Sequence, residues 1–193
     1  MFKVEPDKLA LEYYHRDGFP ATIIRPTNIM GPGSPPIDIW GARNPGFLQR
    51  IIKEETITVP NDGRALLQPC YVEDIAEAFA LALENKKSIG QIYNISSDYS
   101  VTLNEYLRII CEILKRKPPV AYLPMEEMIS QFAGKSALDV GGLKFLCEHM
   151  CCDISKAKRD LGYRASISLE ESIERTVKWM CDKKILLTER RAE

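Results

Sequence analysis

The stretch that most constrains the fold is ATIIRPTNIMGPG, residues 21–33. Its first four residues are small, β-branched or apolar, which predicts a short buried strand. Pro26 cannot donate to a sheet ladder, so we expect Arg25 and Pro26 to end this strand. The glycines of Gly31-Pro32-Gly33 then predict a tight turn in which backbone can approach a ligand closely. In α/β sheets such loops follow the carboxyl ends of strands, where ligands bind.

The overall composition limits the class of protein. A chain of 193 residues, 45% hydrophobic and 27% charged, predicts one globular domain or one domain with a small lobe. The formal net charge of −1 disfavours a dedicated nucleic-acid binder. We see neither a membrane-length apolar run nor a signal peptide, so no membrane partner and a cytoplasmic location are expected. The only cysteine cluster is Cys147, Cys151 and Cys152, which we interpret as packed thiols, with no metal site.

Periodicity and turn signals predict alternating helices and strands. Thr102 with Glu105, and Ser168 with Glu171, have the spacing of capping boxes at two helix starts. The expected helices cover residues 5–17, 45–52, 71–83, 103–115, 125–132, 143–149, 155–161 and 168–181. The expected strands cover 21–24, 56–59 with 65–68 as its partner, 91–95 and 120–123. A helix followed at once by a strand is half of a parallel crossover unit, so we predict an α/β fold.

Several motifs occur together in a familiar order. They are Lys8-Leu-Ala-Leu-Glu12, the R-P-x-N-x-x-G-P-G string that starts at Arg25, the segment QPCYVEDIA at 68–76, and DISKAKRDLGY at 153–163. Together they resemble the extended short-chain dehydrogenase/reductases, the NAD-dependent epimerase/dehydratase family. The resemblance covers only the second half of that family, because the Gly-rich strand–turn–helix that seats a dinucleotide does not occur here.

The resemblance implies an incomplete Rossmann-like, doubly wound parallel sheet, with only its last strands, plus a small α/β substrate lobe. We assign residues 1–33 and 66–117 to the sheet part, 34–65 and 118–182 to the lobe, and 183–193 to a tail. The whole chain is then a C-terminal portion of the fold. The first half is expected on another polypeptide or in a longer gene product. A homodimer through the helix at 5–17 is also implied.

The resemblance assigns the cofactor side of the site to three residues. Lys8 matches the lysine of the family's Tyr-x-x-x-Lys pair, which implies a catalytic role and contact with the ribose of NAD or NADP. Pro26 and Asn28 match positions that border the nicotinamide, and Asn28 also borders the substrate. Val4 stands where the family has its tyrosine, and valine has no proton to give. We therefore expect this chain to be inactive alone.

The substrate side is less well matched to the family. Leu67 stands where sugar-nucleotide members usually have an arginine for the diphosphate, and Arg64 is the nearest replacement. Tyr71, at the start of a helix, is assigned to substrate contact, and Asp74 is interpreted as a helix-terminus acid. The substrate is therefore either a sugar nucleotide or a sterol-like or other ketone.

Two functions follow from these assignments. The first is the substrate-binding half of an NAD(P)-dependent epimerase, dehydratase or 3-beta-hydroxysteroid-dehydrogenase-like oxidoreductase. The second is a non-catalytic binding or scaffold module derived from the family, which Val4 and Leu67 favour.

Overall fold

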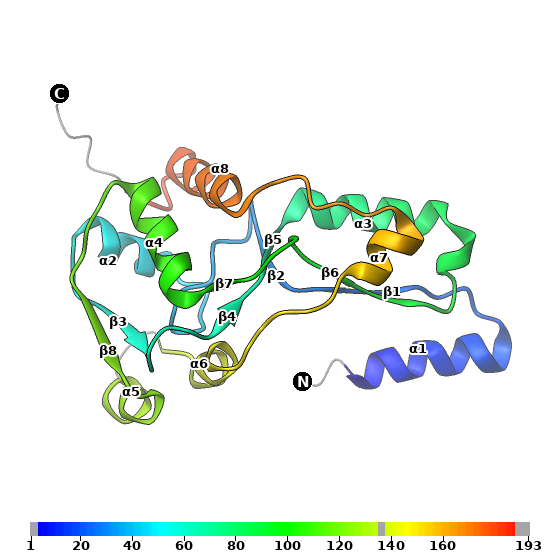
Figure 1. The fold of residues 1–193 in the computed structure, drawn as a ribbon, viewed down its shortest axis with the longest axis horizontal. Helices are drawn as coiled ribbons and strands as arrows, with labels where there is room; N and C mark the ends of the chain where they lie inside the picture. Colours follow the sequence, from blue (N-terminus) through cyan, green and yellow to red (C-terminus); the bar gives the residue numbers. More distant parts are fainter. Residues whose placement is uncertain (1–3, 135–137, 188–193) are drawn as a thin grey trace.

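A computed structural model describes residues 4–134 and 138–187 of the chain. At its centre, strand β1 (Ile23–Pro26) pairs in parallel with strand β6 (Ile92–Ile95), with Ile23 opposite Ile92. Helices α3 (Val72–Glu84) and α7 (Ser155–Leu161) lie on one side of this pair, and α1 (Val4–Asp17) lies on the other (Figure 1). The chain is therefore α/β with parallel strands, which confirms the predicted fold class.

Strand β1 differs from the prediction at its end, because it includes Arg25 and Pro26. Ile23 and Thr27 each donate a backbone N–H to β6, at 2.9 and 3.0 Å. Successive N–H groups of a strand point to opposite edges, so the nitrogen of Pro26 faces away from β6. The missing donor of proline therefore costs the β1–β6 ladder nothing: the strand was predicted to stop before Arg25, whereas it continues through Arg25 and ends with Pro26.

A single residue separates the end of strand β1 from the start of the next strand, β2. Strand β2 (Asn28–Met30) pairs in parallel with β5 (Pro69–Tyr71). Gly31 and Ser34 then close a tight turn through two backbone hydrogen bonds of 3.0 and 2.9 Å. A Cβ on Gly31 would lie 2.5 Å from the side chain of Val72, so this glycine allows the turn to pack against α3.

Two clusters of buried side chains hold the fold together. The sheet core lies where α3 and α7 cover β6, and η1 (Lys86–Ser88) follows α3. The second cluster, which we call the larger core, packs around α4 (Leu103–Leu114) and α8 (Leu169–Asp182). Its other elements are α2 (Gly46–Ile52), β3 (Ile57–Pro60), β4 (Leu66–Leu67), β7 (Val101–Thr102), β8 (Val120–Leu123), α5 (Met125–Phe132) and α6 (Val140–Cys147).

The predicted pairing of the strand at 56–59 with 65–68 was wrong. Strand β3 pairs in parallel with β8, and β4 pairs antiparallel with β7. The turn after β3 is held by other elements: Asn61 donates its N–H to Leu123, and Gly63 accepts the N–H of Asn104. These bonds carry the chain away from β3 before it can return as a hairpin.

The two predicted helix caps form in part. The hydroxyls of Thr102 and Ser168 accept the N–H groups of Glu105 and Glu171, each at 3.1 Å. The carboxylate of Glu105 binds Arg108 on the same helix, and that of Glu171 binds Arg175. The structure thus confirms the helix starts, while the reciprocal half of each capping box is replaced by an ion pair along the helix.

Helix α1 buries none of its side chains within the described residues. Its side chains Val4 and Leu9 are each 54% exposed. The helix is attached through Asp7, whose carboxylate lies 2.6 Å from Arg25 of β1, and through the ring of Tyr14, which packs against Gly90. Figure 1 shows the helix lying apart from the rest of the chain.

Two expectations concern the domain boundaries and the tail. The division into a sheet part and a lobe stays a prediction. Of the expected tail, residues 188–193 lie outside the described part. No helix among the described residues is long and apolar enough to cross a membrane.

Candidate functional site

A cavity of about 620 Å³ opens at the carboxyl ends of β1 and β6. The strand residues Pro26 and Asn94 border it from the sheet, and Asn28 borders it from β2. Its other lining residues are Arg25, Thr27, Ile37, Gly41, Arg43, Phe145, Glu148, His149, Met150, Cys151 and Cys152. The position matches the general rule that ligands of open α/β sheets bind beyond the carboxyl ends of the strands. We call it the strand-end cavity.

Arg43 organises one wall of the strand-end cavity. Its Nη2 donates to Oδ1 of Asn28 at 2.7 Å, and its Nη1 donates to the carbonyls of Ile29 and Pro35 at 2.6 and 2.8 Å. Because Oδ1 of the buried Asn28 is held by this bond, its Nδ2 is the group that remains as a donor. Asn28 therefore presents a fixed amide at the cavity wall.

The positive charge of Arg43 is not neutralised by a carboxylate of the described residues. No Asp or Glu oxygen in ranges 4–134 and 138–187 lies within 4.0 Å of its nitrogens. By contrast, Arg25, the other arginine at the cavity, is paired with Asp7. Desolvation lowers the pKa of Arg43 from its usual value, which is the effect expected for a cation that lacks a partner. An anionic group in the cavity would supply that partner.

The opposite wall follows α6 and carries polar and sulfur-containing groups. Nδ1 of His149 accepts the N–H of Leu66 at 3.3 Å, which leaves Nε2 as the nitrogen that carries a proton in neutral histidine. Gln68 holds the backbone of Cys152 by a 2.8 Å bond, and burial raises the pKa of the Cys152 thiol. That thiol is therefore protonated at neutral pH, and it is not a nucleophile in this state.

The wall at α6 is joined closely to the loop that carries Arg43. Gly41 has φ of +90°, and a Cβ there would lie 2.0 Å from the carbonyl carbon of Gly142. The two backbones meet at a distance that any side chain would prevent.

The structure brings together two of the predicted site residues, Pro26 and Asn28, in the strand-end cavity. Lys8 is exposed on α1 and is not among the residues that line the cavity. Arg64 is 83% exposed, lies 3.6 Å from Asp62, and borders a separate cavity that shares only His149 with this one. Tyr71 is buried in the larger core. The roles of all these residues stay predictions.

The sequence did not identify Arg43 as a site residue, and it indicated only that Asp74 is an acid at a helix terminus. Asp74 is buried and accepts the N–H and hydroxyl of Ser166 at 2.9 and 2.7 Å and the N–H of Ile167 at 3.3 Å. It thus joins α3 to the segment before α8. Arg43 gave no local signal, because its partners lie 8 to 15 residues earlier, in strand β2 and in the loop that follows it.

Parallel strands with a ligand-sized cavity at their carboxyl ends define a Rossmann-like α/β protein. Comparison with known protein families narrows this class to a particular family. Residues 2–96 match the NAD dependent epimerase/dehydratase family, which confirms the resemblance drawn from the motifs, and the chain aligns to a portion of epimerases and dehydratases of this kind. The cofactor of the family is NAD(P), in line with the expectation from the motifs.

The proteins that are similar to this chain have names that describe different functions. The chain is 31% identical over 155 residues to the chloroplast stem-loop binding protein of 41 kDa b of Arabidopsis thaliana, covering 79% of this chain and 37% of the relative. It is 27% identical over 174 residues to a UDP-glucuronate 4-epimerase of Thermodesulfobacterium geofontis, covering 89% and 46%. The crystal structure of UDP-glucuronic acid 4-epimerase from Bacillus cereus with UDP-glucuronic acid and NAD shares the fold, with a TM-score of 0.71, 21% identity, and coverage of 95% and 52%. The chain thus spans about half the length of these proteins or less.

Proposed function

We propose that this chain is the substrate-binding half of an NAD(P)-dependent epimerase, dehydratase or reductase. The observation that carries the proposal is the strand-end cavity, where Pro26, Asn28 and Arg43 meet at the carboxyl ends of parallel strands. The match to the family supports the reaction class.

The proposal also includes a Gly-rich nucleotide-binding unit that completes the fold. The outer edge of β1 has no strand partner within the described residues, and parallel sheets are normally covered and flanked by further elements. The exposed apolar side chains of α1, among them Val4, Leu9 and Tyr13, support the same idea. In this arrangement Lys8 would hold the cofactor ribose.

The substrate that we propose carries an anionic group, and a sugar nucleotide fits better than a sterol. Arg43 offers a positive charge without a carboxylate partner in the described residues, and Asn28 offers a fixed amide donor beside it. A diphosphate would accept from both groups, whereas a sterol would leave the charge unpaired. The name of the UDP-glucuronate 4-epimerase relative is consistent with this choice.

The test is a reconstituted complex. The Gly-rich N-terminal half of the Thermodesulfobacterium epimerase is co-expressed with this chain, and NAD binding and turnover of UDP-glucuronate are measured. Because Val4 supplies no proton, Val4→Tyr is expected to raise turnover about 100-fold, and Lys8→Ala in that background to remove the gain. Lys178→Ala, an exposed helix lysine, is the control. Tight NAD binding by the chain alone, or turnover insensitive to Lys8→Ala, would contradict the proposal.

The second candidate function is a non-catalytic binding module. It is favoured by valine at position 4 and leucine at position 67, which remove the proton donor and the usual diphosphate arginine. For this candidate, the reconstituted Val4→Tyr complex stays inactive although the chain still binds a ligand. The chloroplast relative, named for binding a stem-loop, suggests a stem-loop as one ligand to assay.

A further inference from the structure

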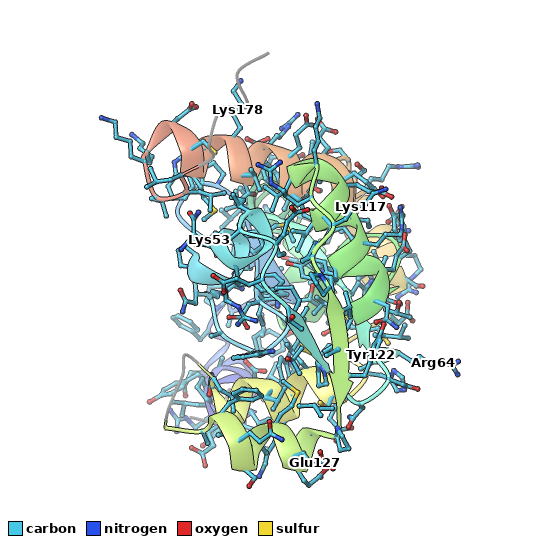
Figure 2. The ribbon with its side chains drawn as sticks, turned by 90° about the vertical axis from the view of Figure 1, so that its left-hand side faces the viewer. Lys53, Arg64, Lys117, Tyr122, Glu127 and Lys178 are labelled. Carbon is cyan, nitrogen blue, oxygen red and sulfur yellow. The ribbon has the colours of Figure 1, made fainter. Side chains whose placement is uncertain are left out.

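A second groove lies between helix α4 and strand β8, and the function proposed above does not use it. It has a volume of about 760 Å³. Leu107 and Cys111 line it from the helix, and Val120 and Tyr122 line it from the strand. The other lining residues are Glu54, Asn104, Arg108, Glu112, Lys115, Arg116, Lys117 and Pro118. We call it the α4–β8 groove; Figure 2 labels Lys117 and Tyr122 beside it.

The outer edge of β8 has free backbone hydrogen-bonding groups. The carbonyls of Pro119 and Leu123 accept from β3 at 2.8 and 2.7 Å, so the odd-numbered residues of β8 direct their backbone groups to β3. The N–H and C=O of Val120 and Tyr122 therefore point to the other edge. Within the described ranges, β3 is the only strand paired with β8. The two residues with outward backbone groups are the two that line the groove.

The strand side of the groove also exposes apolar side chains. Val120 is 43% and Tyr122 52% exposed, although both belong to a strand. The Tyr122 hydroxyl is held at 3.2 Å from Oδ1 of Asn104 on α4, so the ring stands in a fixed position across the groove. An apolar side chain laid along β8 would cover both residues.

One end of the groove is basic. Lys115, Arg116 and Lys117 follow α4 directly, and in the part of the chain that the structure describes none of their side-chain nitrogens lies within 4.0 Å of a carboxylate. The two acidic residues that line the groove both have hydrogen-bonding or ion-pair partners. Glu112 pairs with Arg108, and Glu54 accepts the backbone N–H of Lys117 at 3.1 Å. The free charge at this end is positive.

We propose that the α4–β8 groove binds an extended acidic peptide segment of a partner protein, which adds to the outer edge of β8 as a third strand. Main-chain bonds to Val120 and Tyr122 supply the alignment, alternate apolar side chains cover these two residues, and acidic side chains pair with Lys115 and Lys117. A peptide fits better than a nucleic acid, because the outward N–H and C=O groups of Val120 and Tyr122 match the alternating donors and acceptors of an extended peptide, which a sugar–phosphate backbone lacks.

The test uses a fluorescein-labelled octapeptide of alternating Glu and Val, followed by fluorescence anisotropy with the full chain. We expect saturable binding that weakens as salt is added, and about tenfold weaker binding to the Lys115→Glu/Lys117→Glu variant. The matched control is Lys86→Glu/Lys87→Glu on the exposed η1 segment, which should bind as the unmodified chain does.

A second variant tests the strand edge separately from charge. Val120→Pro removes only an outward N–H, so the β3 ladder and the melting temperature should be retained while peptide affinity falls about tenfold. Val120→Thr keeps the N–H and should bind normally. The proposal is overturned if a Lys/Val peptide binds equally well, if no Glu/Val binding occurs up to about 1 mM, or if single-stranded RNA binds the groove and the peptide does not compete.

Discussion

Asp38 offers a quantitative test of how burial affects stability in this fold. The residue is 5% exposed, and its Oδ1 accepts the N–H groups of Trp40 and Ala42 at 2.8 and 3.0 Å. Desolvation raises the pKa of Asp38 from 3.8 to about 6, and the charge of Asp139 adds to this. The two N–H bonds and the charge of Arg50 lower the pKa, but by less than desolvation raises it.

The sign of the effect follows from linkage. Since the folded chain binds the Asp38 proton more tightly than the unfolded chain, the stability from this group is complete below the unfolded pKa of 3.8. It is lost as pH rises to the folded pKa of about 6 and does not change further above it. A pKa difference of this size corresponds to a loss of about 3 kcal/mol in the free energy of unfolding at neutral pH.

Asp38→Asn tests this figure, because asparagine keeps the Oδ1 acceptor and loses the charge. Urea unfolding of both proteins is measured at about pH 4 and about pH 7.5, and the variant should gain about 2.4 kcal/mol relative to the parent between the two, because about 0.6 kcal/mol of the effect is already present at pH 4. Glu77→Gln, on the exposed face of α3, should show almost no gain. An Asp38→Asn protein whose stability relative to the parent is the same at both pH values would refute the reasoning.

Two further predictions concern single contacts. Asp74→Ala should lower the free energy of unfolding by about 2 kcal/mol in urea, because the N–H groups of Ser166 and Ile167 lose a charged acceptor, and Asp74→Asn should cost about half as much. Arg43→Gln should weaken UDP binding by about tenfold in calorimetry and leave uridine binding unchanged, with Arg43→Lys intermediate because it keeps the charge but not the fork that holds Asn28. Equal UDP affinity in all three proteins would rule out the anion-binding role.

Local sequence rules were sufficient for most helices and for the central strands. The predicted helix at 155–161 agrees with α7 at both ends, because Gly162 adopts φ of +71° and ends it. The caps at Thr102 and Ser168 involve only neighbours in sequence, so the residue types alone define them. Contacts of this kind are fully specified by spacing along the chain.

Strand pairing and the cavity could not be predicted in the same way. The partner of β3 is β8, about 60 residues further on, and nothing within a run of four residues specifies which strand it will meet. Arg43 reaches Asn28 only because the irregular chain between them folds back, with Gly41 against Gly142. Asn28 was found by its motif, whereas its partner needed the three-dimensional path of the loop.

Lys8 shows how the two kinds of information combine. Its motif assigns it to a dinucleotide, but α1, which carries it, is attached mainly by the pair Asp7–Arg25 and the packing of Tyr14 on Gly90. An ion pair that is partly open to solvent contributes about 1 kcal/mol or less, so these contacts fix the helix only weakly. Arg25 itself lines the strand-end cavity, and Asp7 precedes Lys8 directly. The same ion pair therefore connects the helix that carries Lys8 with the strand-end cavity that Arg25 lines.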